Sequence, residues 1–163
     1  MITALYAGSF DPITYGHLDI IKSGSKVFDK LIIGIGHNSQ KRGLIPISDR
    51  IDLIKECVSD FSNVEVLSYE GLTADFAKAN NINILVRGLR NTTDFEYEKE
   101  MAQFNYVLNS ELETVFLLSK PENSFLSSSG VRELILHKKD VSDFVPQNVA
   151  KYLYQKTNKS DIN

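Results

Sequence analysis

Residues 4–17 read Ala4-Leu5-Tyr6-Ala7-Gly8-Ser9-Phe10-Asp11-Pro12-Ile13-Thr14-Tyr15-Gly16-His17. The stretch opens with apolar residues, which are typical of a short buried strand over residues 2–6. Gly8 then lets the backbone approach a ligand with no side chain in the way. Asp11-Pro12 marks a turn, because proline presets its own φ and biases the preceding residue away from helix. Thr14 is a good N-cap, which places His17 at the third helical position.

The helix predicted after this turn has an apolar face, because Leu18, Ile21 and Phe28 recur at helical spacing. Its first residues lie beside the hydroxyl of Ser9 and the imidazole of His17. Unpaired amides and the positive end of the helix dipole favour anions at such a position. The opening stretch therefore predicts a strand, a tight turn and an anion-binding helix start.

Strands and helices alternate along the rest of the chain. Such alternation predicts an α/β fold, a Rossmann-like parallel sheet with helices on both faces. We interpret residues 1–163 as a single domain, with 157–163 as a frayed tail. The predicted strands are 31–36, 64–67, 82–87 and 113–118. One predicted helix follows a cap at Ser48, a second runs over 73–80, and a third runs from Thr92 or Thr93 to about Leu108. A fourth follows a cap at Ser127 or Ser128 and runs toward His137, and a fifth begins at Pro146.

Each polar loop of interest follows a predicted strand. Ligands in open parallel sheets bind outside the carboxyl ends of the strands, so these loops should converge on one edge. The loops are 8–17, 37–43, 68–73, 87–91 and 119–128.

Composition excludes several classes of protein. The 163 residues carry a formal net charge of −3, which argues against a sequence-independent nucleic-acid binder. The single cysteine, Cys57, excludes an intrachain disulfide. The first residues lack the features of a signal peptide, and no apolar run approaches the roughly 20 residues of a membrane span. We therefore expect a cytoplasmic protein that binds neither membrane nor nucleic acid.

Each candidate site residue also has a purely structural interpretation. His17 could be a capping or core histidine, although the adjacent Gly16 and the upstream Asp-Pro turn favour chemistry. Ser9 could simply stabilise the turn, and Lys41 with Arg42 could be solvated loop charges. The serines of 127–129 could only cap a helix.

Arg87-Gly88-Leu89-Arg90 ends an apolar strand, where a buried charge needs a partner. The planar guanidinium of arginine suits bidentate phosphate contacts. Alternatively the arginines pair with Asp94, Glu96 or Glu98. By pattern alone, Glu98 lies on the solvent face of the following helix.

Two motifs carry a resemblance to a known family. Thr14-x-Gly16-His17 resembles the T/H-x-G-H signature of the nucleotidyltransferase superfamily, and Ser127-Ser128-Ser129-Gly130-Val131-Arg132 resembles its second signature, S-S-[ST]-x-x-R. With Ser9-Phe10-Asp11-Pro12, the chain is similar to the phosphopantetheine adenylyltransferase family of bacterial coenzyme A synthesis. The resemblance extends from Ala4 to about Pro146.

The resemblance implies a reversible transfer of an adenylyl group from ATP to 4′-phosphopantetheine, giving dephospho-coenzyme A and pyrophosphate. It implies Mg²⁺ bound with ATP and no metal-ligating residues of the protein. It also implies feedback inhibition by coenzyme A and a homohexamer. Two alternatives stay open: a nucleotidyltransferase with another phosphorylated acceptor, and a non-catalytic nucleotide-binding sensor.

The resemblance also assigns the site residues. The catalytic set is His17, Lys41 and Arg90. The phosphopantetheine set is Ser9, Lys41, Thr73 and Arg87. The ATP set is Ser9, Phe10, His17, Gly88, Leu89, Arg90, Glu98, Asn123, Ser124, Phe125, Leu126, Ser127, Ser128 and Ser129. Three of these positions depart from the family: Ser9 is usually threonine, Thr73 is usually apolar, and Asn123 replaces an aromatic residue.

Overall fold

The computed structural model describes residues 1–160, and its centre is one five-stranded sheet. All strands pair in parallel, in the order β3-β2-β1-β4-β5, as the alternation of elements predicts. The strands are β1 (Thr3–Gly8), β2 (Lys30–His37), β3 (Val64–Glu70), β4 (Ile84–Leu89) and β5 (Glu113–Leu118).

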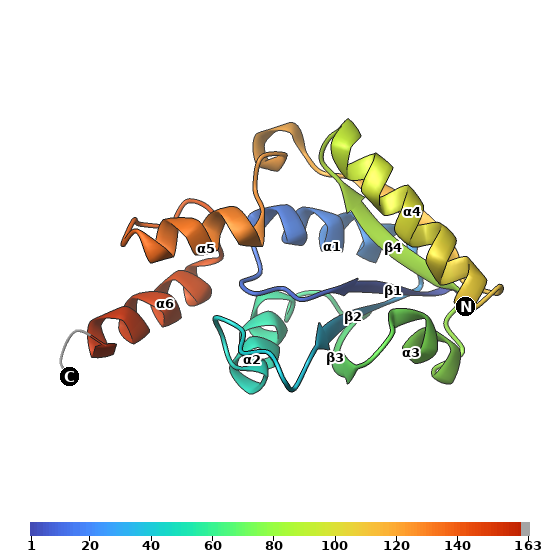
Figure 1. Cartoon of the computed structure of the whole chain (residues 1–163), viewed down its shortest axis with the longest axis horizontal. Coiled ribbons are helices and arrows are strands. Elements are labelled where there is room, and N and C mark those ends of the chain that lie inside the picture. Colours follow the sequence, from blue (N-terminus) through green and yellow to red (C-terminus); the bar gives the residue numbers. More distant parts are fainter. Residues whose placement is uncertain (161–163) are drawn as a thin grey trace.

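The helices connect these strands and extend beyond the last one (Figure 1). They are α1 (Tyr15–Val27), α2 (Ile47–Cys57), α3 (Thr73–Ala79), α4 (Thr92–Leu108), α5 (Ser128–Leu136) and α6 (Gln147–Ser160), with a short 3-10 helix, η1 (Pro121–Asn123), that the sequence does not predict. Residues 157–160 of the predicted frayed tail are the last residues of α6, where Thr157 Oγ1 donates a hydrogen bond to the Leu153 carbonyl 2.9 Å away. Residues 161–163 of that prediction lie outside the described residues.

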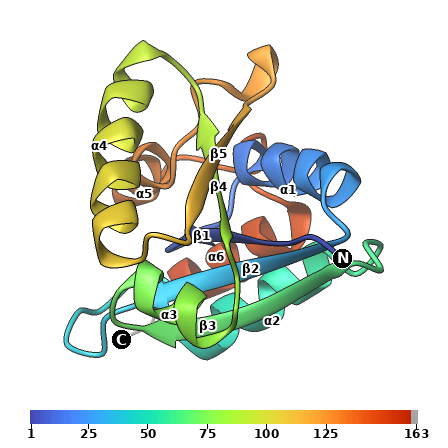
Figure 2. The same cartoon turned by 90° about the vertical axis from the view of Figure 1, so that its right-hand side faces the viewer.

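Two apolar cores form because alternate residues of each strand point to opposite faces of the sheet. Tyr6 and Ile33 face the larger core, which holds residues of α1, α2 and α6. Leu5 and Ile32 face the smaller core, which α3 covers. Figure 2 shows α1 and α4 on opposite sides of β4 and β5, so helices cover both faces as predicted.

Helix caps show where the local predictions hold. Thr14 caps α1 as expected, and Ser127 rather than Ser128 caps α5. Ser48 is not a cap, because α2 already begins at Ile47, directly after Pro46. The helix α4 begins at Thr92, as predicted, and its cap is Asn91, whose side chain accepts a hydrogen bond from the Asp94 amide 2.9 Å away.

The order of the strands reverses beside β1. The chain passes from β1 outward to β2 and β3, and then crosses to β4 on the other side of β1. The turn after β1 and the end of β4 therefore meet at the topological switch point, where open α/β sheets bind ligands.

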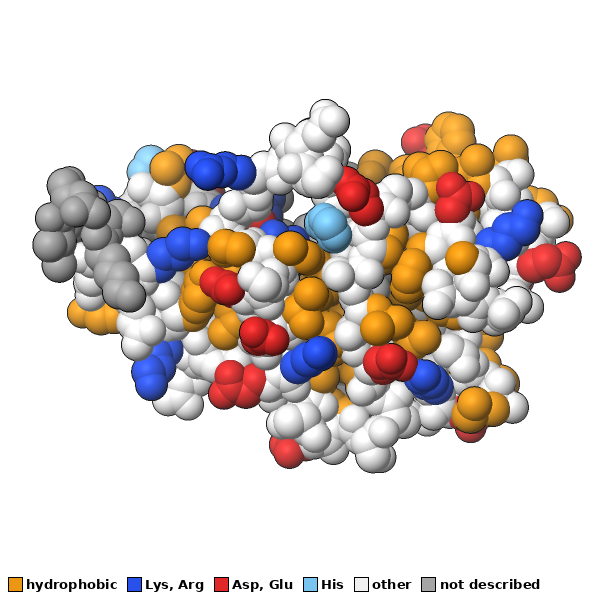
Figure 3. Space-filling view, turned by 90° about the horizontal axis from the view of Figure 1, so that it is seen from below, with side chains coloured by type: hydrophobic (Ala, Val, Ile, Leu, Met, Phe, Trp, Pro, Cys, Tyr) orange, Lys and Arg blue, Asp and Glu red, His pale blue; other side chains and the backbone are white. Residues whose placement is uncertain are grey.

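The surface carries charges of both signs. Lys, Arg, Asp and Glu side chains are interspersed over the face in Figure 3, with apolar atoms between them. Among residues 1–160, no helix has the length and apolar character needed to cross a bilayer.

Candidate active site

A cavity of about 330 Å³ opens at the switch point, between the ends of β1 and β4. Its walls come from the turn after β1, the first residues of α1, the end of β4, the start of α4 and the start of α5. The lining residues with polar side chains include Ser9, Thr14, His17, Arg87, Arg90, Asp94, Tyr97, Glu98, Ser127, Ser128, Ser129 and Arg132.

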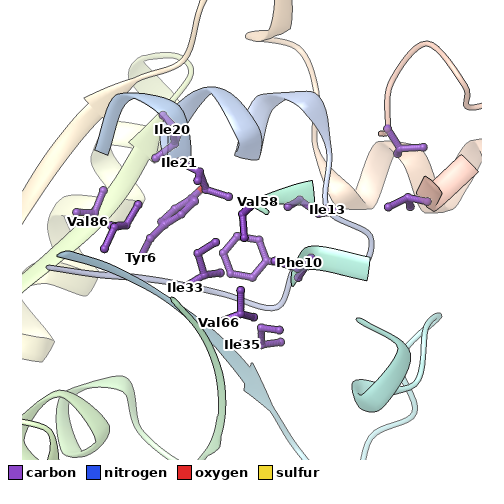
Figure 4. Close-up of a cluster of buried hydrophobic side chains, with 14 of the residues drawn as sticks. Tyr6, Phe10, Ile13, Ile20, Ile21, Ile33, Ile35, Val58, Val66 and Val86 are labelled. Atoms are coloured by element: carbon purple, nitrogen blue, oxygen red, sulfur yellow. The ribbon is translucent and has the colours of Figure 1, made fainter. Parts of the chain in front are cut away.

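The turn after β1 is built around a buried phenylalanine. Phe10 has a φ of 46° and its side chain is 1% exposed. Figure 4 shows its ring inside the core near Ile33 and Val58. The ring faces inward, and Phe10 is also one of the residues that line the main cavity. The peptide bond that follows Asp11 is cis.

His17 is held in one orientation by the helix cap. The Thr14 amide donates to His17 Nδ1 at 3.0 Å, and the His17 amide donates to Thr14 Oγ1 at 3.4 Å, a reciprocal capping box. Because Nδ1 accepts a hydrogen bond, the proton of the neutral imidazole sits on Nε2. Burial, and then the positive charges of Arg87 and Arg90, lower the pKa of His17 to about 4. The ring is therefore a neutral Nε2–H donor at the edge of the cavity at pH 7.

Arg87 is fixed by a two-point contact with Glu98. Its Nε and Nη2 donate to the two carboxylate oxygens at 2.8 and 2.7 Å, and its Nη1 donates to the Ala7 carbonyl. Burial lowers the pKa of Arg87, but the hydrogen bonds and charge of Glu98 outweigh it and leave that pKa raised. Glu98 is 8% exposed, so the solvent-face interpretation is wrong: α4 packs on β4 and turns this residue toward the strand.

Arg90 is held in the same way. Its Nε and Nη2 donate to the carboxylate of Asp94 at 2.8 and 3.0 Å, and its Nη1 donates to the Leu126 carbonyl at 3.0 Å. The hydrogen bonds from Arg90 lower the pKa of Asp94, so the pair stays charged. The predicted alternative, that these arginines pair with carboxylates of the following helix, is therefore confirmed for both. Both arginines also line the cavity.

The start of α5 is joined to the first turn by hydrogen bonds. Ser128 Oγ donates to the Pro12 carbonyl at 2.8 Å. Arg132 Nη1 donates to the Asp11 carbonyl at 2.8 Å, and its Nη2 donates to Ser129 Oγ at 3.1 Å. The two motifs, more than 100 residues apart, therefore form one wall. Arg132 lines the cavity although it is not among the predicted site residues; its place in the S-S-S-x-x-R motif was the available signal.

The cavity gathers most of the predicted ATP residues and omits others. Leu89, Asn123, Ser124 and Phe125 do not line it. Asn123 instead donates from its Nδ2 to Asp19 Oδ2 at 2.7 Å, which ties η1 to α1. Those that line it are Ser9, Phe10, His17, Gly88, Arg90, Glu98, Leu126, Ser127, Ser128 and Ser129.

The predicted phosphopantetheine residues are divided among three cavities. Thr73 lines a smaller cavity of about 90 Å³ against α4, and its Oγ1 lies 2.7 Å from the Tyr69 hydroxyl. Arg87 lines both this cavity and the main one, so the two adjoin. Lys41 lines a separate cavity of about 460 Å³, together with Arg42 and Arg50.

Several further lining residues are not in the predicted sets, and three of them have large polar side chains on β1 and α4. Tyr6, Asp94 and Tyr97 belong to the walls of the main cavity. Tyr6 is 5% exposed and burial raises its pKa, so its phenol stays protonated. Asp94 and Tyr97 stand one helical turn apart on α4, a spacing that could have marked a common face.

Comparison with known proteins agrees with this geometry. Residues 5–134 match the cytidylyltransferase-like family. The chain is 48% identical to a phosphopantetheine adenylyltransferase of Caldanaerobacter subterraneus, over 98% of this chain and 100% of that protein. It is 50% identical to one of Clostridium botulinum, over 91% and 94%. In fold it resembles a Vibrio parahaemolyticus protein described as a nicotinate-nucleotide adenylyltransferase, with a TM-score of 0.65, 19% identity and coverage of 94% and 99%.

Proposed function

The chain belongs to the cytidylyltransferase-like family and, within it, to the phosphopantetheine adenylyltransferases, and we infer that it catalyses their reaction. It is a nucleotidyltransferase of coenzyme A biosynthesis. It transfers the adenylyl group of ATP to the phosphate of 4′-phosphopantetheine, reversibly, and forms dephospho-coenzyme A and pyrophosphate. The identity over nearly the full length of the curated relatives carries this conclusion, and the cavity at the switch point supports it.

The proposed chemistry uses positioning and electrostatics rather than a covalent intermediate. The phosphate of phosphopantetheine is already ionised, so it can attack the α-phosphorus of ATP in line without a general base. His17 offers a neutral Nε2–H to an oxygen of the α-phosphate as negative charge builds on it. The neutral form suits this role, because its Nε2–H donates a hydrogen bond and the reaction needs no proton transfer to or from the ring.

ATP lies on the α5 side of the cavity in this proposal. The backbone of Phe10, the hydroxyl of Ser9 and the serines of 127–129 face the triphosphate. Arg90, which donates to the Leu126 carbonyl, lies beside these serines. Gly88 lines the cavity at the end of β4, where a Cβ would lie 2.9 Å from Ile20 Cγ1. Leu89, Asn123, Ser124 and Phe125 contact the nucleotide from outside the present cavity, and Glu98 contacts it beside Arg87.

The acceptor approaches from the α4 side. Arg87 lies between the main cavity and the Thr73 cavity, so the phosphate binds at Arg87 and the pantetheine arm extends past Thr73. Met101 and Ala102 line that smaller cavity and supply apolar contact for the arm. Lys41 reaches the same phosphate from its loop, and with His17 and Arg90 it completes the proposed catalytic set.

Mg²⁺ enters with ATP and neutralises part of its charge. The two carboxylates that line the main cavity, Asp94 and Glu98, each accept two side-chain hydrogen bonds from an arginine, Arg90 and Arg87. Phosphate oxygens and water are therefore the ligands we propose for the ion.

Pyrophosphate release from MgATP over a panel of acceptors tests the function. We expect turnover with 4′-phosphopantetheine and little with nicotinate mononucleotide or an alcohol phosphate. A preference for another acceptor would favour a related nucleotidyltransferase, and ATP binding without any turnover would favour the sensor.

Coenzyme A contains the phosphopantetheine arm, so we propose that it competes for the same groove. The Thr73 hydroxyl already contacts Tyr69, which leaves the arm little apolar surface at this position. Thr73→Leu should therefore tighten inhibition. Initial rates at several phosphopantetheine concentrations decide the matter: an apparent KM that coenzyme A leaves unchanged contradicts a shared groove.

We propose a homohexamer that works in the cytoplasm. The long helix α4 exposes apolar side chains that a monomer leaves in water: Tyr97 is 60%, Phe104 64% and Val107 81% exposed. Contiguous apolar surface of this kind favours subunit contact. Light scattering should give six chains for the native protein and fewer for Phe104→Glu, while six chains in both would remove α4 from the interface.

A further inference from the structure

Arg50 is a buried arginine outside the three sets of predicted site residues. It lies on α2 and is 6% exposed. Its Nη1 donates to the Ser9 carbonyl at 2.9 Å, and its Nη2 donates to the Ile45 carbonyl at 2.6 Å. Ser9 belongs to the turn before His17, and Ile45 follows the loop that carries Lys41. One guanidinium therefore joins the two segments that must meet at the acceptor phosphate.

Asp11 reinforces this junction from the other side. Its Oδ2 lies 3.5 Å from Arg50 Nη2 and accepts a hydrogen bond from the Leu44 amide at 2.7 Å. Its Oδ1 accepts from the Ile45 amide at 2.9 Å. Asp11 is 7% exposed, and a buried charge that loses its partner is costly. The segment after Lys41 is thus fixed by buried groups.

Gly43 allows the close approach. A Cβ at this position would lie 2.4 Å from Arg50 Nη2 and 2.7 Å from Asp11 Oδ2, far inside contact distance. The backbone two residues after Lys41 therefore rests directly on the Arg50–Asp11 pair. Any shift of this pair moves the end of the lysine loop.

The same turn is tied to the ATP side. The Asp11 carbonyl accepts from Arg132, which also contacts Ser129. The Asp11 side chain therefore holds the segment after Lys41, and the Asp11 carbonyl is joined through Arg132 to Ser129. This connection sets where Lys41 stands relative to the groups that hold the triphosphate.

We propose that Arg50 is a positioning residue: it sets the place of Lys41 relative to the Ser9–His17 turn, and through it the binding of the acceptor phosphate. This role rests on the proposed function. A planar guanidinium can donate to two carbonyls at once in a fixed geometry, whereas a lysine ammonium is a flexible point charge. Lysine should therefore not replace it.

The test is Arg50→Lys, with KM and kcat measured for both substrates. We expect the KM for phosphopantetheine to rise by about tenfold or more and the KM for ATP to stay within about twofold, because small misplacements of a binding group cost up to roughly 100-fold. Gly43→Ala keeps Arg50 and displaces the same segment, so it should raise the same KM. Lys55→Ala, which removes an exposed cation from the same helix, is the control and should change neither KM.

A purely structural Arg50 would lower the melting temperature and the active fraction, and hence kcat per total protein, while both KM values stayed at the wild-type level. That result in Arg50→Lys and Gly43→Ala overturns the proposal. If Arg50→Lys does not fold, Gly43→Ala alone decides it. Absence of phosphopantetheine-dependent turnover in the wild-type protein would instead refute the proposed function, and so separates the two failures.

Discussion

The arginines on β4 and the lysine loop after β2 present positive charge in two different ways. Arg87 and Arg90 are each held at two points by a carboxylate on α4. Lys41 and Arg42 stand exposed on a loop, beside a different cavity. The arginines are ordered before substrate arrives, while the loop must order its side chains as it binds. Of the proposed catalytic set, His17, which the Thr14 cap holds, and Arg90 are ordered in this way, whereas Lys41 belongs to the exposed loop.

The largest effect should come from the ordered side, at His17. His17→Ala should lower kcat by about 10²–10³-fold, or about 2.7–4 kcal/mol, because one preorganised donor is lost at the phosphate. ATP affinity should change little. Single-turnover rates and calorimetry measure the two effects separately. Near-normal turnover would remove His17 from the mechanism.

Glu98→Gln tests whether the carboxylate orders Arg87. The change keeps the shape and removes the charge, so we expect a loss of about 1.5–3 kcal/mol in the free energy of unfolding. Glu96→Gln is the matched control on the same helix: its partner is Lys99, its side chain is 64% exposed, and the loss should stay within about 0.5 kcal/mol. If urea denaturation gave the same loss of unfolding free energy for Glu98→Gln and Glu96→Gln, the buried contact with Arg87 would stabilise the protein no more than an exposed ion pair does.

Lys41→Ala tests the loop. A charge-assisted hydrogen bond is worth about 1.5–3 kcal/mol, and an exposed lysine should contribute at the low end, so phosphopantetheine binding should weaken about tenfold. ATP binding should hardly change. Lys22→Ala, an exposed lysine on α1, is the control. A larger loss for ATP than for phosphopantetheine in calorimetry would reverse the assignment.

The smallest effect concerns pH. The pKa of His17 is lowered to about 4, so the unfolded chain binds this proton more readily than the folded one below about pH 6.5. Its contribution to stability is complete above that pH and decreases as the pH falls toward 4. Between about pH 7 and 5.5 the wild type should lose about 1 kcal/mol more than His17→Asn. Equal slopes for the two proteins would show that the ring titrates normally.

Much of this fold could be predicted because its signals are local. The apolar runs of β1 and β2 show on a single strand, and the cap of Thr14 on His17 spans three residues. The Ser48 cap is wrong, because α2 already begins at Ile47, directly after Pro46. Ends depend on small energy differences that packing readily reverses.

By itself, then, the sequence determined the order of strands and helices, the caps of α1 and α5 and the family. Only the tertiary structure decided that Glu98 is buried against Arg87, that Lys41 stands apart from the His17 cavity, and that Arg50 joins their two segments. The reason is physical. Caps and apolar periodicity involve residues within a turn of each other, whereas the partner of a buried charge is chosen by which distant segments the sheet brings together.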